Sequence, residues 1–368
     1  ILAQAAGLER GAAPRMIQYD PSKGSLWTAL SYVGTVLPDV WSSCEFRLFW
    51  VFHLAVFAAT RAELIPPDIF ERFGLSWDAI GIVTSMMTFF EVFYTNTSYA
   101  RYTALYSDVR LMLANVQHFA FLLRLFVSDR MPRHSELTLR YTMASVWLHF
   151  QILKQAQQSL KIEGLMKRGL LNEGEVDQLN QHAEADQPQV LLQWAAISIN
   201  QAVTKDMASA AIGYKLVDHL LQISFHQEAV VNASVLQVPF QYFHLLNSMI
   251  MANCFLLAWA LGNMRSWFVP GAYMISSTIF IGMMDLASKL SDPFGEDEVD
   301  FDLDRWADLE IEVALAMLDG HVVGREAGLK KLLEEDLPLP LPLEKDGEAA
   351  AEFLSDRWTE RPLLLDSA

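Results

Sequence analysis

Residues 236–290 hold two long apolar runs, LQVPFQYFHLLNSMIMANCFLLAWAL (Leu236–Leu261) and WFVPGAYMISSTIFIGMMDLASKL (Trp267–Leu290). A helix that crosses the hydrocarbon core of a bilayer needs about 20 mostly apolar residues. Both runs reach that length and carry few charges. The short link Gly262–Ser266 forces them into an antiparallel hairpin. The sequence therefore predicts a membrane protein.

Two further apolar segments, Phe46–Thr60 and Trp77–Tyr94, lie nearer the N-terminus. Each is interrupted by ionisable residues, namely Arg47 and His53 in the first and Asp78 and Glu91 in the second. Taken singly, such a segment is more often a buried core helix. Four of them in one chain favour four spans, at about 46–60, 77–94, 236–261 and 267–290, with Trp and Tyr gathered at their edges as in interfacial belts.

The segment between the second and third spans, residues 100–235, has a helical pattern. Apolar residues recur at spacings of three and four in Leu111–Val127 and Leu137–Leu165, with Ser135 as the expected cap of the second. A polar turn is expected around Asn172 and Gly174, and a helix break at Gln187-Pro188. We therefore expect an all-α fold in which an aqueous helical domain, 100–235 and 300–320, continues from the membrane helices.

Composition excludes several classes of protein. The chain is 52% hydrophobic with a net charge of −17, and a nucleic-acid binder would normally be basic. The two cysteines, Cys44 and Cys254, cannot build a disulfide framework. Motifs of the common hydrolases, nucleotide-binding folds and zinc proteases are absent, so the sequence predicts no enzyme. The end of the chain, residues 321–368, alternates Leu and Pro in part and is expected to form an extended arm.

A dense acidic stretch, LSDPFGEDEVDFDLDRW (Leu290–Trp306), follows the fourth span. Pro293 and Gly295 predict a tight turn that can aim carbonyl oxygens inward, and calcium takes about six to eight oxygen ligands. Asp297 and Asp300 would share a face if a helix began here. The alternative is a solvated acidic stretch at a helix N-terminus, where carboxylates suit the helix dipole. The pattern alone slightly favours this alternative.

A stripe of residues recurs every four positions along the second span: Gly81, Ser85, Phe89 and Phe93. Such a stripe is one helix face and usually packs into a core. Around a central axis it could instead line a pore, because phenyl rings have a positive edge that attracts anions weakly. Glu91 lies roughly opposite Phe89, and an ionisable group at that depth needs water or a partner such as Arg47 or His53.

Four motifs follow one another along the chain: TFFEVFYTNTSYARY from Thr88, RYTMASVWLHFQIL…LMKRGLLNEGEVDQL across Arg140–Leu179, LQVPFQY from Leu236, and DPFGEDEVDFD from Asp292. Together, over about 25–320, they resemble the bestrophin family of anion channels. The last motif is similar to the calcium clasp of that family. The resemblance implies a homopentamer around one central pore, with a channel core at 25–320 between an N-terminal segment, 1–24, and the tail.

The resemblance also assigns residues. It implies a pore neck at Ser85, Phe89 and Phe93, where Ser85 departs from the usual aliphatic residue. It implies a second, aqueous aperture near Ala211 or Ile212. For calcium it implies side-chain ligands from Asp297 and Asp300. It also implies backbone carbonyl ligands from Lys289, Asp292 and a residue near Gln18.

The function implied is a passive channel for chloride or bicarbonate, with calcium as cofactor and lipid, its own copies and anions as partners. With this resemblance, a calcium site becomes preferred over the solvated acidic stretch. The alternative function is a non-conducting membrane scaffold that recruits a partner through the tail. The Ala-rich start of the chain and the plastid-like FYTNTSYARY favour a thylakoid membrane in a chloroplast, with the plasma membrane as the other choice.

Overall fold

The computed structural model describes residues 31–319, apart from 33, 67–76, 206–208, 237 and 296. The described residues form eleven α-helices and no strand, as the sequence predicted. They divide into two compact units. Among the described residues, unit 1 takes 31–114 and 225–308, and unit 2 takes 115–224 and 309–319. Gln18 and the tail lie outside the described residues.

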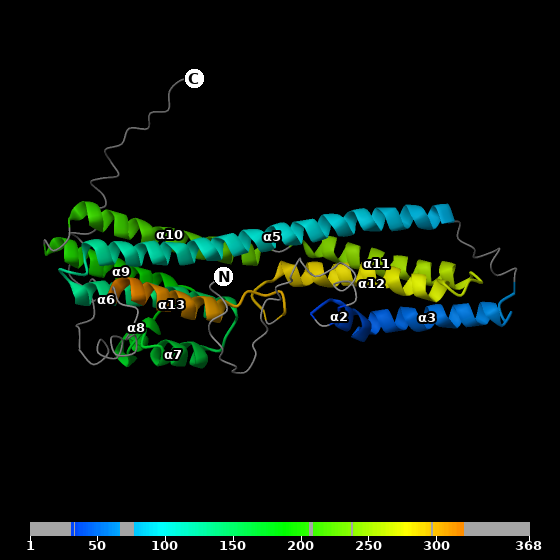
Figure 1. Ribbon diagram of the computed structural model, residues 1–368, viewed down its shortest axis with the longest axis horizontal. Coiled ribbons are helices and arrows are strands. Elements are labelled where there is room, and N and C mark those ends of the chain that lie inside the picture. Colours follow the sequence, from blue (N-terminus) through cyan, green and yellow to red (C-terminus); the bar gives the residue numbers. More distant parts are fainter. Residues whose placement is uncertain are drawn as a thin grey trace, which may run out of the picture. The chain divides into compact units, whose positions relative to one another are not determined.

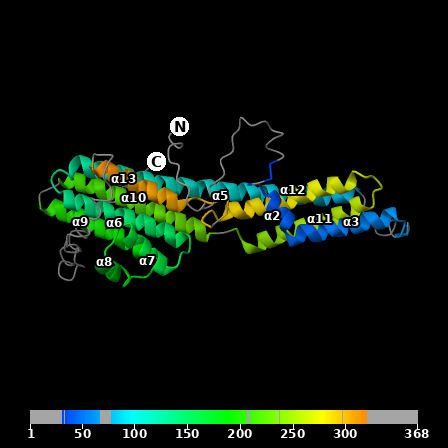
Figure 2. The ribbon, with the colours of Figure 1, turned by 60° about the horizontal axis from the view of Figure 1, so that its bottom comes forward.

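Unit 1 is a bundle of apolar helices. It contains α2 (Leu37–Ser42), α3 (Cys44–Arg61), α11 (Phe240–Gly262), α12 (Val269–Ser291) and the first part of α5 (Trp77–Phe126). Helices α3, α11 and α12 run side by side, and a short link joins α11 to α12 (Figures 1 and 2). The hairpin predicted from the sequence is therefore confirmed.

Three helices are long and apolar enough to cross a membrane: α5, α11 and α12. Helix α3 covers the first predicted span, but it does not meet the same criterion of length, hydropathy and number of charges. Its 18 residues include three charged side chains, Glu45, Arg47 and Arg61. The structure thus supports three of the four predicted spans by length and composition, and it leaves the fourth as a prediction.

Helix α3 is nevertheless packed closely into unit 1. Its residue His53 is fully buried, the ring Nδ1 lies 3.0 Å from the carbonyl oxygen of Ala258 in α11, and the ring stacks on Tyr273 of α12. Gly262 permits the close approach of α11, since a Cβ there would come within 2.7 Å of Val56. His53 is thus a packed, hydrogen-bonded residue.

Unit 2 is built around α6 (Pro132–Leu153). It packs chiefly against α9 (Gln187–Thr204), with α7 (Gln158–Lys167) and α8 (Glu173–Leu179) in the same unit. The C-terminal end of α5, most of α10 (Ala210–Val235) and the end of α13 (Leu303–Asp319) also belong to unit 2. Nearly every side chain of α6 from Leu137 to Gln151 is buried, so this helix is the core of the unit.

Several predicted boundaries were wrong. The second span does not end at Tyr94, because α5 continues as one helix of 50 residues that absorbs the predicted helix Leu111–Val127. The predicted helix Leu137–Leu165 is two helices, α6 and α7. Ser135 is not a cap: α6 begins at Pro132, and the Ser135 hydroxyl donates within the helix to the carbonyl oxygen of Met131.

Other boundaries were predicted correctly. Asn172 precedes α8 and caps it, because its side chain accepts from the backbone N–H of Glu175 while the Glu175 carboxylate accepts from the N–H of Asn172. Gly174, expected in the turn, lies inside α8 instead. The Gln187-Pro188 pair opens α9, where proline at the first turn loses no hydrogen bond.

The cap at α8 also holds a buried charge cluster. One Glu175 carboxylate oxygen lies 2.5 Å from a guanidinium nitrogen of Arg140 and accepts from the Tyr141 hydroxyl at 2.7 Å. Arg140 and Glu175 are both almost fully buried. Burial, followed by the Glu175 charge, raises the pKa of Tyr141 above its usual range. The cluster therefore joins α6 to α8 through charges that have no access to water.

We predict that Glu175→Ala lowers the stability of the protein by about 3–5 kcal/mol, because it leaves the Arg140 charge buried without a partner. Thermal unfolding of the detergent-solubilised protein measures the effect. Glu173→Ala is the matched control, since Glu173 is exposed two residues earlier on the same helix. Equal unfolding temperatures for the two variants would contradict the role given to the cluster.

Candidate functional site

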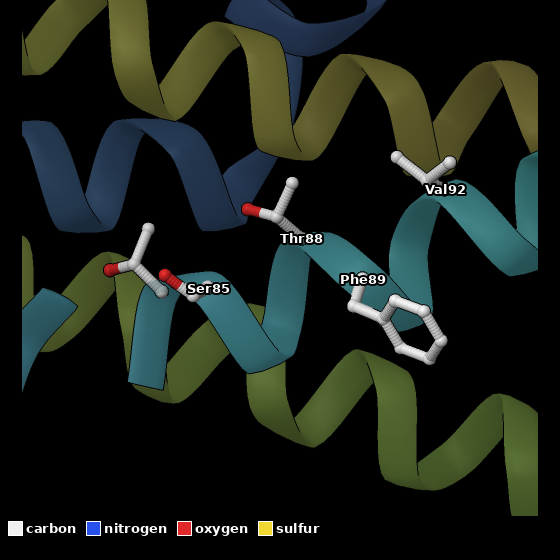
Figure 3. A pocket seen from close by; sticks show the side chains of 5 residues that line it. Ser85, Thr88, Phe89 and Val92 are labelled. Carbon is white, nitrogen blue, oxygen red and sulfur yellow. The ribbon is translucent and has the colours of Figure 1, made fainter. Parts of the chain in front are cut away.

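The predicted pore-neck residues occupy an exposed face of α5. Ser85 is exposed, and the exposed fractions of Phe89 and Phe93 are 68% and 57%. Figure 3 shows Ser85, Thr88, Phe89 and Val92 on this face, which with Thr84 lines an open hollow of 440 Å³. The described residues thus leave two phenyl rings, one turn apart, largely exposed, although the Phe93 ring also makes an edge contact with Tyr242 of α11.

The opposite face of α5 is buried in unit 1. Met87, Glu91 and Tyr94 are all less than 5% exposed, and Met87 and Tyr94 join the apolar core formed with α11 and α12. The exposed phenyl face is therefore surplus to the packing of one subunit. Large apolar surfaces of this kind mark contact with lipid, with another chain or with a pore.

Glu91 is 4% exposed and its Oε1 has no hydrogen-bond partner in the described part of the chain. The pairings expected from the sequence are not formed there. Arg47 donates from Nε to the carbonyl oxygen of Ser43, and His53 contacts Ala258. The prediction that Glu91 lies opposite Phe89 is confirmed.

The acidic turn after α12 is closed by its own backbone. The N–H of Phe301 donates to the Pro293 carbonyl oxygen at 3.0 Å, and the N–H of Asp300 donates to the Asp297 carbonyl oxygen at 3.0 Å. The N–H of Asp297 in turn donates to Oδ2 of Asp300 at 2.6 Å. Helix α13 begins only at Leu303. The two acids are therefore brought together by a turn rather than by the start of a helix.

Asp300 is the buried acid of this turn. It is 4% exposed, and its Oδ1 has no hydrogen-bond partner among the described residues. A Cβ on Gly295 would lie 2.9 Å from Oδ2 of Asp300, so the turn closes over the carboxylate only because residue 295 is glycine. Burial first, and then the neighbouring charges of Asp297 and Asp292, raise the pKa of Asp300 to about 6.

This environment suits a cation. A buried carboxylate with an unused oxygen and like charges beside it is stabilised by any positive charge that reaches it. Asp297 and Asp292 are exposed at the same turn, and the Lys289 carbonyl accepts only a long bond, 3.3 Å, from the N–H of Asp292. The Lys289 ammonium instead binds Asp39 and, at 2.9 Å, Asp285.

The described residues contain no group of three or more His, Cys, Asp or Glu side chains placed to hold a metal. A cation at the turn would therefore use two side chains, Asp297 and Asp300, and carbonyl oxygens for the rest. That is the donor set expected from the sequence. Gln18, the remaining expected ligand, lies outside the described residues.

Aromatic residues that sequence reasoning did not single out fix the turn to α5. The Tyr102 hydroxyl donates to the Val299 carbonyl oxygen at 2.9 Å, and its ring lies 4.9 Å from that of Phe301. Phe301 also contacts Tyr106 and Trp306. The available signal was the spacing of four between Tyr102 and Tyr106, which places both rings on one helix face.

Arg101 caps the end of α10. Its two terminal guanidinium nitrogens donate to the carbonyl oxygens of Leu236 at 2.7 Å and Ser234 at 3.0 Å. Such carbonyls are left without partners at a helix C-terminus, where a positive charge also suits the dipole. Arg101 thus holds the junction between α10 and α11.

The predicted aperture residues, Ala211 and Ile212, lie in the first turn of α10 within unit 2. Together with Leu122 and Phe126 of α5 and with Lys215 they line a hollow of 120 Å³. Ala211 is exposed and Ile212 is half-buried. The structure thus places both on an accessible surface but does not by itself make them a constriction.

The fold and the apolar helices define an all-helical membrane protein. The chain belongs to the bestrophin family of anion channels: residues 18–315 match the family model described as Bacterial/Fungal Bestrophin protein. Bestrophin homolog 5 of Caenorhabditis elegans is 26% identical over 322 residues. That match takes in 81% of this chain and 66% of the worm protein, just under two thirds of its length.

Solved structures share the fold. Two single-residue variants of a bacterial bestrophin homolog from Klebsiella pneumoniae match with TM-scores of 0.66 and 0.67, each at 19% identity. The first match covers 74% of this chain and 97% of the bacterial chain, and the second covers 78% and 100%. The expected family and helical membrane fold are thereby confirmed.

We predict that, without divalent cations, Asp300→Asn stabilises the protein at pH 7 by on the order of 2 kcal/mol. With its pKa raised to about 6, Asp300 favours folding when protonated. That contribution is complete below about pH 4 and is lost as the pH rises through about 6. The gain from Asn should therefore vanish near pH 4.

Thermal unfolding between pH 4 and pH 7 tests this sign. Glu298→Gln removes one negative charge from an exposed position of the same turn and serves as the control. A variant Asp300→Asn that is less stable than the unmodified protein at pH 7, with cations removed, would show that the buried charge is compensated in some other way.

Proposed function

We propose that the chain is a passive anion channel for chloride or bicarbonate, assembled as a homopentamer around one pore. The observation that carries the proposal is the exposed phenyl face of α5, on a helix that can span a membrane. In a ring of subunits this face would line the axis, and the apolar face opposite it already packs into unit 1.

The neck would consist of Ser85, Phe89 and Phe93. Ring edges that face an axis offer anions a weak attraction without a site deep enough to trap them. The apolar surface also disfavours a continuous water column, which makes a neck of this kind suited to gating. Ser85, a small hydroxyl residue, would make its layer of the neck more polar than the phenyl layers.

Ala211 or Ile212 would form the second, aqueous aperture. Their accessible position at the start of α10 is compatible with that role. Lys215, which lines the same hollow, would add a positive charge close to the path of the anion. A local positive charge of this kind can favour anions even though the net charge of the whole chain is −17.

The acidic turn would bind calcium through Asp297, Asp300 and the carbonyl oxygens of Lys289 and Asp292, and a carbonyl near Gln18 in the sequence is a further expected donor. The orphaned, buried Oδ1 of Asp300 is the feature that fits a cation best. Bound calcium would supply positive charge to the acids. The turn would hold its shape through the hydrogen bond from Tyr102 to Val299 and through the ring of Phe301.

A second candidate function is a non-conducting membrane scaffold that recruits a partner through the Leu- and Pro-rich tail. Such a scaffold would still assemble as a pentamer but would conduct no anions. For the membrane itself we propose the thylakoid, with the plasma membrane as the other location.

Purified protein in liposomes should release chloride or bicarbonate down a gradient. Phe89→Ala and Phe93→Ala should each widen the neck, so flux rises severalfold and discrimination against larger anions weakens. Leu48→Ala is the control, because this exposed residue of α3 is apolar as well but lies outside the neck. Neck variants that conduct with unmodified rate and selectivity would contradict the pore assignment.

The scaffold proposal has its own readout. Protein that is pentameric by mass measurement but passes neither anion, with calcium present or chelated, would favour it. The scaffold also requires that truncation after Leu333 releases a bound partner.

Calcium binding is measured separately, by calorimetry on the detergent-solubilised protein. Asp297→Asn and Asp300→Asn should each weaken calcium binding at least tenfold, since each removes a charged ligand, whereas Glu298→Gln should leave it nearly unchanged. Equal losses in all three variants would indicate a diffuse electrostatic effect rather than a built site.

A further inference from the structure

Two histidines face each other across α5 and α10 within unit 2. The ring centroids of His118 and His219 lie 5.9 Å apart with the ring planes at 61°. His118 is exposed and His219 is half-buried, so the pair is open to solvent in the single chain. Neither residue is part of the neck or of the acidic turn.

The half-buried histidine is oriented by a neighbour. Nδ1 of His219 lies 3.1 Å from Oδ1 of Asn115, one turn before His118 on α5. A carbonyl oxygen can only accept, so Nδ1 carries the hydrogen and the lone pair of a neutral ring lies on Nε2. Metal-binding histidines are typically fixed in this way, with one ring nitrogen held by an oxygen and the other left free to coordinate.

The surroundings also favour the neutral ring. Burial, and then the charge of His118, lowers the pKa of His219, while Asp218 acts in the opposite direction. A metal ion binds the neutral form of imidazole.

The spacing of the pair suits one shared ion. Zinc binds imidazole nitrogen at about 2.0–2.1 Å, which puts the centroids of two rings on one ion about 5–6 Å apart. We propose that His118 and His219 form a binding site for a divalent transition metal such as zinc. Water would complete the coordination, because the described residues supply no third His, Cys, Asp or Glu ligand to the pair. Imidazole ligands suit zinc, copper and nickel better than calcium or magnesium.

The site adjoins the hollow near the start of α10. Leu122 follows His118 by four residues, Lys215 precedes His219 by four, and both line that hollow. The pair is therefore one helical turn away from it. A bound ion would tie α5 to α10 there and add positive charge. Any effect on conduction rests on the proposed function, whereas the binding itself does not.

Zinc chloride titrated into the full chain in detergent, by calorimetry, tests the site. Calcium is kept in excess so that the acidic turn does not take up zinc. Zinc should bind, and His118→Ala and His219→Ala should each weaken binding at least tenfold. His182→Ala, an exposed histidine between α8 and α9, should bind zinc like the unmodified protein.

Substitutions of Asn115, which orients His219, give an independent test. Asn115→Ala should weaken zinc binding by about tenfold or more, while Asn115→Asp, which keeps an acceptor for Nδ1, should retain it. Absence of zinc binding, or equal affinity in the unmodified protein, His118→Ala and His219→Ala, would overturn the proposal. Unfolding temperatures of the variants guard against loss through misfolding.

Measurements of anion flux separate zinc binding at the histidine pair from any effect of zinc on conduction. Zinc should change the flux through the unmodified protein and leave His118→Ala unaffected. Zinc binding that depends on both histidines but leaves flux unchanged would uphold the metal site and overturn its link to conduction.

Discussion

The division of α5 into two faces is the constraint on which the rest of unit 1 depends. One face carries Met87 and Tyr94 into an apolar core shared with α11 and α12, and the other carries Phe89 and Phe93 outward. Close packing of the first face against α11 and α12 fixes the rotation of the helix. The direction of the second face follows from that rotation.

Buried polar groups mark the places where packing alone does not explain the chain. In unit 2 the charges of Arg140 and Glu175 pair with each other, and Glu175 also takes part in the capping of α8, so they belong to the architecture. Asp300 is different, because its Oδ1 is buried and has no hydrogen-bond partner among the described residues. An unpaired carboxylate costs free energy unless it is neutralised. The acidic turn holds this carboxylate in a loop that the contacts of Tyr102 with Val299 and Phe301 fix to α5.

Sequence patterns located the apolar helices well because length and hydropathy are summed over many residues. The α11–α12 hairpin followed from a link too short for any other path. Single-residue signals were less secure. Ser135 has the chemistry of a cap, yet Pro132 starts α6 earlier, since proline fits the first turn without losing a hydrogen bond. Continuity of α5 past Tyr94 was hidden because its polar residues after the apolar run resemble the end of a span.

The sequence by itself determined the family, the helical class and the residue types of the acidic turn, because these depend on order and composition along the chain. Tertiary structure alone decided which acid is buried. Asp297 and Asp300 are equivalent in sequence, but the return of Phe301 to the Pro293 carbonyl and the missing side chain of Gly295 enclose only Asp300. Tertiary structure also brought together His118 and His219, which are 101 positions apart in the sequence. Contacts between distant segments arise from packing, and no local pattern records them.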